Sequence, residues 1–95
     1  AKAPIIISKG RGKIAESIIK KGKELKIGTM QSPQLARAIY YTSEIGDEIV
    51  SKLYNAVAIA LAYIYKIDNG EEIEKPEIEM PEDMIFDEFG RKNDK

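Results

Sequence analysis

The chain has 95 residues and a mass of 10.6 kDa, which is the size of one small domain. Hydrophobic residues make up 43% of the sequence and charged residues 33%, a composition typical of globular proteins. The sequence contains no cysteine and no histidine, which excludes disulfide scaffolds, thiol redox centres, zinc fingers and histidine-based catalysis. We therefore expect neither an enzyme nor a bound metal or other cofactor.

The net charge of −1 combines two halves of opposite sign. Residues 1–67 carry eleven Lys/Arg and five Asp/Glu, whereas residues 68–95 carry four Lys/Arg and eleven Asp/Glu. A basic body is therefore followed by an acidic tail. Either both halves are simply solvated, or the tail folds back on the body or contacts another subunit.

In chain order, the first predicted element is a strand at residues 4–8 (PIIIS), because this β-branched run is apolar throughout and is followed by two glycines. Residues 11–26 then carry apolar side chains at helical spacing, which predicts a helix. A second short strand is expected at residues 27–30.

Ser32 and Pro33 begin a second predicted helix, since serine is a favoured N-cap and proline is tolerated at the first helical position. A turn follows at residues 44–47. The third predicted helix covers residues 50–67, and its apolar residues lie on several faces, so we expect it to be the most buried element.

This order predicts an α/β (α+β) fold, with a small sheet of about two strands packed by about three to four helices. Two strands alone make a marginal sheet, so either a partner supplies strands or the chain is the remainder of a larger domain. We divide the chain into a domain at 1–67 and an acidic, flexible tail at 68–95. Within the tail, residues 81–89 could form a short helix.

Two further patterns carry little functional information. Residues 10–15 (GRGKIA) fit the glycine pattern of dinucleotide-binding turns, but the acidic residue required about 20 positions later is absent. We interpret the pattern as a tight turn. The longest apolar run, residues 56–65, is half of the ~20 residues that a membrane-spanning helix needs, and no signal peptide is apparent, so we expect a soluble chain.

The basic body leaves nucleic-acid binding as an alternative function. Exposed aromatic residues for base stacking are not evident among the basic side chains, so only weak, electrostatic binding is expected. The candidate phosphate contacts are Lys9, Arg11, Lys13, Lys20, Lys21, Lys23 and Lys26.

Three ordered segments carry a resemblance to a known family. They are residues 3–10 (APIIISKG), 32–40 (SPQLARAIY) and 53–65 (LYNAVAIALAYIY). Together they closely resemble the cytoplasmic domain of the FlhB/YscU/SpaS family, the substrate-specificity switch proteins of type III export machines. The resemblance covers residues 3–67, and the tail looks most like the flagellar branch.

The resemblance implies a function in protein export rather than catalysis. It implies a docking domain at the cytoplasmic face of the inner membrane, which binds early export substrates of the rod and hook type and contacts other export-gate or ring proteins. The family's substrate-binding patch corresponds here to Ala3, Pro4, Ala58 and Leu61. Ala58 and Leu61 are three residues apart and share a helical face, although both could instead belong to the core.

Two departures from the family pattern bear on these expectations. The family cleaves itself within an Asn-Pro-Thr-His loop, and this sequence has neither that tetrapeptide nor any histidine, so we expect no such cleavage here. The family sheet has about four strands, and the two around the cleavage loop would precede residue 1. An N-terminal segment that supplies these strands is therefore a further candidate partner.

Overall fold

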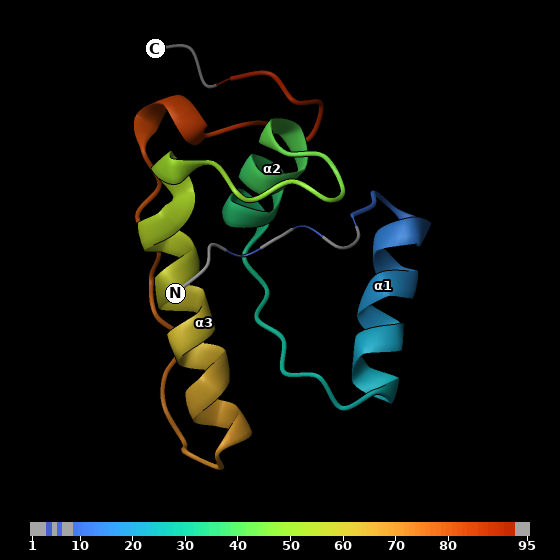
Figure 1. Cartoon of the computed structure of the whole chain (residues 1–95), viewed down its shortest axis with the longest axis vertical. Coiled ribbons are helices and arrows are strands. Elements are labelled where there is room, and N and C mark those ends of the chain that lie inside the picture. The colour runs from blue at the N-terminus through green and yellow to red at the C-terminus, as the bar shows by residue number, and fades with distance from the viewer. Residues whose placement is uncertain (1–3, 5, 7–8, 93–95) are drawn as a thin grey trace.

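The structure, a computed structural model, describes residues 4, 6 and 9–92. Its elements are α1 (Lys13–Glu24), α2 (Pro33–Thr42), η1 (Ser51–Leu53), α3 (Tyr54–Asp68) and η2 (Glu82–Met84), where η denotes a 3₁₀ turn. Helices α1 and α3 lie on opposite sides of the molecule, and α2 lies between them towards one end (Figure 1). The three helices predicted from apolar spacing are therefore present, with Pro33 at the start of α2 as expected.

The predicted α/β class is wrong for the part of the chain that the structure describes, which is helical and contains no strand. Of the first predicted strand, only Pro4 and Ile6 are described. Three backbone hydrogen bonds connect them to the loop at 46–49. One short pairing of this kind does not make a sheet. The second predicted strand, at 27–30, is a loop that follows Lys26, whose φ of 58° turns the chain.

The hydrophobic core lies where α2, α3 and the C-terminal segment meet. Leu53 and Ala38 are fully buried, with exposed fractions of 0%. Helix α1 contributes no buried residue, and a groove of about 430 Å³ separates its inner side from α2. The buried apolar residues are Ile6, Leu35, Ala38, Ile49, Leu53, Ala56, Val57, Ala60, Met84 and Phe86. Completion of the fold by strands from another segment stays a prediction.

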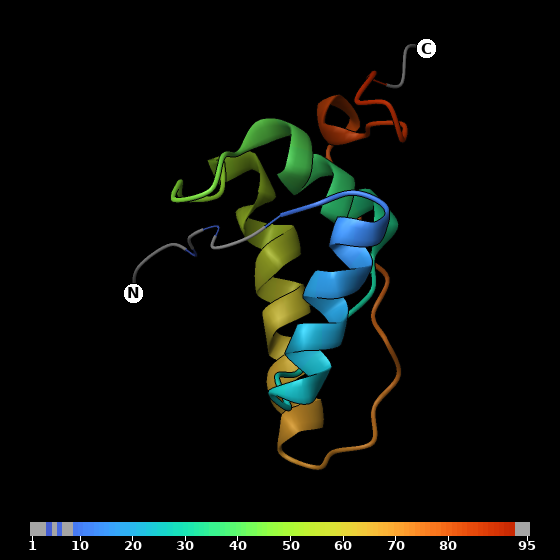
Figure 2. The same cartoon turned by 90° about the vertical axis from the view of Figure 1, so that its right-hand side faces the viewer.

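The chain after α3 reverses direction and returns to the beginning of that helix (Figures 1 and 2). At the end of this return Lys52 forms an ion pair with Asp83, and Arg37 Nε donates to the Phe86 carbonyl at 2.9 Å. Met84 and Phe86 are buried in the core. The division into a domain at 1–67 and a flexible tail at 68–95 stays a prediction, and within residues 81–89 the helical part is the 3₁₀ turn η2.

Hydrogen bonds to carboxylates stabilise the last described residues. Asp87 Oδ1 accepts from the backbone N–H groups of Arg91 and Phe89, both at 2.9 Å, and these bonds hold the pKa of Asp87 below its usual 3.8. The hydrogen bond from Lys52 likewise lowers the pKa of Asp83. Both carboxylates are therefore ionised at neutral pH, and their negative charge strengthens these contacts.

Gly90 provides a test of how the C-terminal segment packs. Its φ is +86°, and a Cβ atom there would lie 2.6 Å from a ring carbon of Tyr41. Gly70 has a similar φ of +82° but open space around its Cβ position. We expect Gly70→Ala to lower the free energy of unfolding by ~1 kcal/mol through backbone strain alone. Gly90→Ala should cost about 1–3 kcal/mol more because of the ring contact. Urea denaturation measures both, and equal losses would mean that Gly90 does not pack against Tyr41.

Candidate functional site

Helix α3 is buried along one face only. Leu53, at the end of η1, and three residues of α3 follow one another at helical spacing and turn towards α2 and the C-terminal segment. Small side chains dominate this buried seam, which allows close approach of the helix to its neighbours. The seam consists of Leu53, Ala56, Val57 and Ala60.

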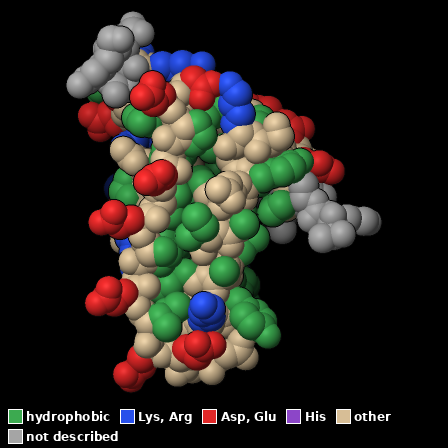
Figure 3. Space-filling view, turned by 90° about the vertical axis from the view of Figure 1, so that its left-hand side faces the viewer, with side chains coloured by type: hydrophobic (Ala, Val, Ile, Leu, Met, Phe, Trp, Pro, Cys, Tyr) green, Lys and Arg blue, Asp and Glu red, His purple; other side chains and the backbone are tan. Residues whose placement is uncertain are grey.

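A second row of side chains on α3 is apolar and faces solvent. Its members are four, three and four residues apart, so they lie above one another on one side of the helix. Leu61 is 50% exposed, and the tyrosines at the two ends of the row are 46% and 70% exposed. We call Tyr54, Ala58, Leu61 and Tyr65 the α3 stripe. Figure 3, which views the molecule from the side on which α3 lies, shows hydrophobic side chains gathered on that side.

The structure thus brings Ala58 and Leu61 together on one exposed surface. The sequence is compatible with either a surface patch or the core, and in the structure both residues are exposed. Tyr65 is 70% exposed, so it does not belong to the buried seam. The two tyrosines of the α3 stripe were missed as surface residues. Their spacing from Ala58 and Leu61 places them on the same side of the helix. This spacing alone did not predict exposure, because the helix is apolar on several faces.

Pro4 lies near the beginning of α3. Its carbonyl accepts a hydrogen bond from the N–H of Ile49 at 3.1 Å, and Ile49 is a core residue shortly before η1. Pro4 itself is half-buried. Ala3, the fourth residue of the expected patch, lies outside the described residues. The structure therefore places Pro4 at the segment that leads into α3, and Ala58 and Leu61 further along the helix.

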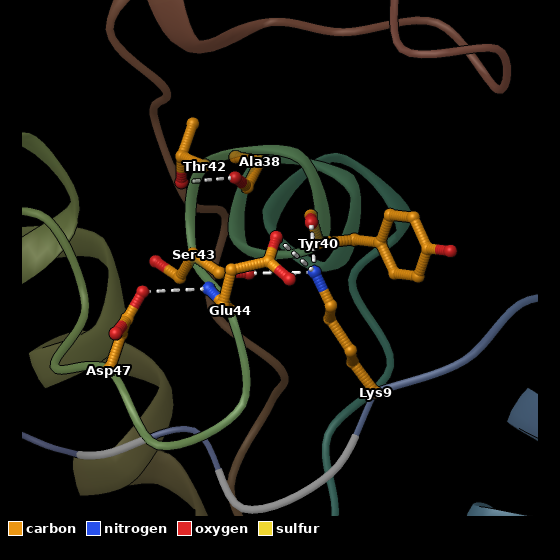
Figure 4. Close-up of polar contacts among 7 residues, drawn as sticks. All are labelled: Lys9, Ala38, Tyr40, Thr42, Ser43, Glu44 and Asp47. Atoms are coloured by element: carbon orange, nitrogen blue, oxygen red, sulfur yellow. Dashed lines mark hydrogen bonds and ion pairs between the residues drawn. The ribbon is translucent and has the colours of Figure 1, made fainter.

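Lys9 connects the N-terminal segment to the end of α2 (Figure 4). Its Nζ donates to the carbonyls of Tyr40 and Ser43, at 3.1 and 2.8 Å, and to Glu44 Oε2 at 3.2 Å. The same cation lies 4.8 Å from the centre of the Tyr40 ring. A cation at a helix C-terminus is favourable because the last carbonyls are partly negative. These contacts fix the loop that also binds Pro4 and Ile6.

The exposed side chains of α3 are mostly apolar. Among residues 4, 6 and 9–92, no three His, Cys, Asp or Glu side chains are grouped in a way that could hold a metal ion. The α3 stripe presents aliphatic and aromatic area, and a row of acidic side chains lies along one edge of the same face (Figure 3). A small alanine beside a leucine makes a shallow apolar depression, which suits one anchoring side chain of a bound peptide.

Comparison with known proteins agrees with the resemblance seen in the three segments. The family model described as the FlhB HrpN YscU SpaS Family matches residues 1–64. The chain therefore belongs to the FlhB HrpN YscU SpaS family. Within it, the chain is 43% identical over 63 residues to the flagellar biosynthetic protein FlhB of Aquifex aeolicus. It is 38% identical over 90 residues to the FlhB of Salmonella typhimurium, so the flagellar branch is favoured.

These matches cover different shares of the proteins compared. The alignment to the Aquifex protein includes 66% of this chain and 18% of the relative, and that to the Salmonella protein includes 88% and 24%. The chain thus spans about a quarter or less of either relative. The uncharacterized protein YlqH of Bacillus subtilis is 33% identical over 67 residues, which are 70% of this chain and 71% of YlqH. In the described part of the chain, no helix is long and apolar enough to cross a membrane.

Proposed function

We propose that this chain is a protein-binding component of a flagellar-type export apparatus. The α3 stripe docks unfolded segments of export substrates, and the domain takes part in the switch from early to later substrates. Binding rather than catalysis is the activity of the chain. Its partners are rod- and hook-type substrates together with other export-gate or ring proteins, at the cytoplasmic face of the inner membrane.

The observation that carries this proposal is the solvent exposure of Leu61 and Ala58 in a chain that belongs to the export family. A leucine that is 50% exposed, in line with two exposed tyrosines, is not needed to fill the core. Aromatic and aliphatic side chains that are clustered on one helix face are typical of protein-binding surfaces. The family resemblance supports substrate segments as the ligand of that surface.

An NMR titration tests the proposal. The isotopically labelled full chain is mixed with the N-terminal segment of an early export substrate, and backbone amide shifts are followed. We expect the shifts to cluster on α3 around Ala58 and Leu61. Shifts confined to α1, on the opposite side of the molecule, would contradict docking at the α3 stripe.

Nucleic-acid binding is the alternative that the same titration examines, with a DNA or RNA oligomer as ligand. Several cations of the body already contact internal acceptors: Lys9 binds carbonyls and Glu44, Arg11 donates to the Glu88 carbonyl, and Lys52 pairs with Asp83. The exposed lysines of α1 remain for phosphate contacts. We expect only weak, salt-sensitive shifts on α1 with the oligomer.

A further inference from the structure

The segment between α3 and η2 presents its acidic side chains to solvent. We call residues 71–80 the acidic strap. Its apolar residues Ile78 and Met80 are half-buried and pack against the core. Its five glutamates are exposed, and none forms an ion pair with a described residue. They are Glu71, Glu72, Glu74, Glu77 and Glu79.

The position of the acidic strap is fixed at both ends. It follows shortly after α3, which ends at Asp68, and it leads to the Lys52–Asp83 ion pair beside the start of α3 and to buried Met84. The strap therefore passes along the length of α3 (Figures 1 and 2). In Figure 3 the acidic side chains form a row along one edge of the face on which the hydrophobic side chains of α3 gather.

From this juxtaposition we propose that the acidic strap is part of the docking surface and selects segments that carry lysine or arginine close to an apolar anchor. The inference rests on the proposed function, because it assumes that the α3 stripe receives the anchor. The ligand is an extended peptide with one aliphatic side chain on the stripe and basic residues a few positions away. Five glutamates and one lysine give the strap a net negative charge. At physiological ionic strength, the Debye length of ~8 Å sets the range over which this charge acts on the basic residues of the ligand.

Charge complementarity of this kind sets specificity more than total affinity. The apolar contact with the α3 stripe is common to every segment with an aliphatic anchor. The strap adds attraction for cationic segments and repulsion for acidic ones, so it distinguishes between segments with the same anchor. The association rate of basic segments should also rise at low ionic strength.

Three synthetic peptides of equal length test the inference on the full chain. The first has a leucine anchor flanked by lysines, the second has the same anchor flanked by glutamines, and the third has the lysines with serine in place of leucine. We expect the first to bind about tenfold more tightly than the second at low salt, and the two to converge at high salt. The third should bind too weakly to measure. Dissociation constants are obtained by calorimetry or by NMR titration.

A pair of matched variants assigns the effect to the strap. In one, Glu74, Glu77 and Glu79 are replaced by Gln. In the other, Glu16, Glu24 and Glu48, which are also exposed but lie outside the strap, are replaced by Gln. We expect the strap variant to remove most of the preference for the lysine peptide, and the control variant to retain it.

The outcomes separate this inference from the proposed function. If both leucine peptides bind equally well and Leu61→Asp abolishes both, the strap inference is overturned while docking at the α3 stripe stands. If neither peptide binds, the proposed function fails and the inference fails with it. Equal loss of preference in the two triple variants would overturn the inference, because the effect would then reflect net charge alone.

Discussion

Leu61→Asp is expected to weaken binding of an export-substrate segment by about 10- to 100-fold. Burying an aliphatic side chain against a leucine contributes about 1.5–3 kcal/mol, and a carboxylate at this position removes that contact and must itself be desolvated. Because Leu61 is 50% exposed in the free chain, the substitution should change the free energy of unfolding by less than ~1 kcal/mol. The two effects are measured by NMR or calorimetric titration and by urea denaturation.

Ile14→Asp provides the matched control for this prediction. Ile14 is also an exposed aliphatic residue of a helix, at 63%, but it belongs to α1 on the other side of the molecule. We expect this variant to bind the segment as the wild type does. If Leu61→Asp binds normally, the α3 stripe is not the docking site. If it unfolds the chain instead, Leu61 contributes to the core more than its exposure indicates.

The helices could be predicted from the sequence because their signals are local. Ser32 and Pro33 precede α2, and apolar residues recur at helical spacing through α1 and α3. A strand needs partners that local sequence does not contain. The β-branched run at residues 4–8 indicated a strand, yet in its described part Pro4 and Ile6 have only a short pairing with the loop at 46–49. The sheet was therefore the part of the fold that was predicted wrongly, since the described residues contain no strand.

The candidate site could be predicted only in part, because it too depends on contacts between segments that are distant in sequence. The family resemblance indicated Ala58 and Leu61, but helix α3 is apolar on several faces, and its spacing alone does not say which face is covered. That depends on contacts with α2 and with the C-terminal segment, which are distant in sequence. Once Met84 and Phe86 are known to be buried in the core, the side of α3 that carries Leu61 and Tyr65 is seen to face solvent.

In the C-terminal segment, a few buried apolar residues attach a largely acidic stretch to the hydrophobic core. Its composition indicated a solvated tail, and residues 71–80 do keep their glutamates in solvent. The short apolar run at 84–86 nevertheless provides two core residues. The Phe86 ring lies 5.7 Å from the ring of Tyr41 at an interplanar angle of 32°. Such aromatic contacts add to the stabilisation that burial alone provides.

Phe86→Ala is accordingly expected to lower the free energy of unfolding by about 3–5 kcal/mol. Phe86 is 7% exposed, so truncation leaves a cavity between α2 and the C-terminal segment. A loss of that size is a large share of the ~5–15 kcal/mol by which domains are usually stable. Urea denaturation of the full chain measures the loss. Proteolysis of residues beyond Gly70 should accelerate in parallel, because the segment would open more often.

Phe89→Ala is the matched control, since Phe89 lies three residues further along and is 63% exposed. Its ring contacts the Arg91 guanidinium at 5.5 Å, a surface interaction worth about 0.5–1 kcal/mol. We expect this variant to remain close to the wild type in stability. Similar small losses in both variants would mean that residues 68–95 are the flexible tail that their composition indicates. A large loss for Phe86→Ala alone would show that the segment contributes to the folded domain, as the burial of Met84 and Phe86 indicates.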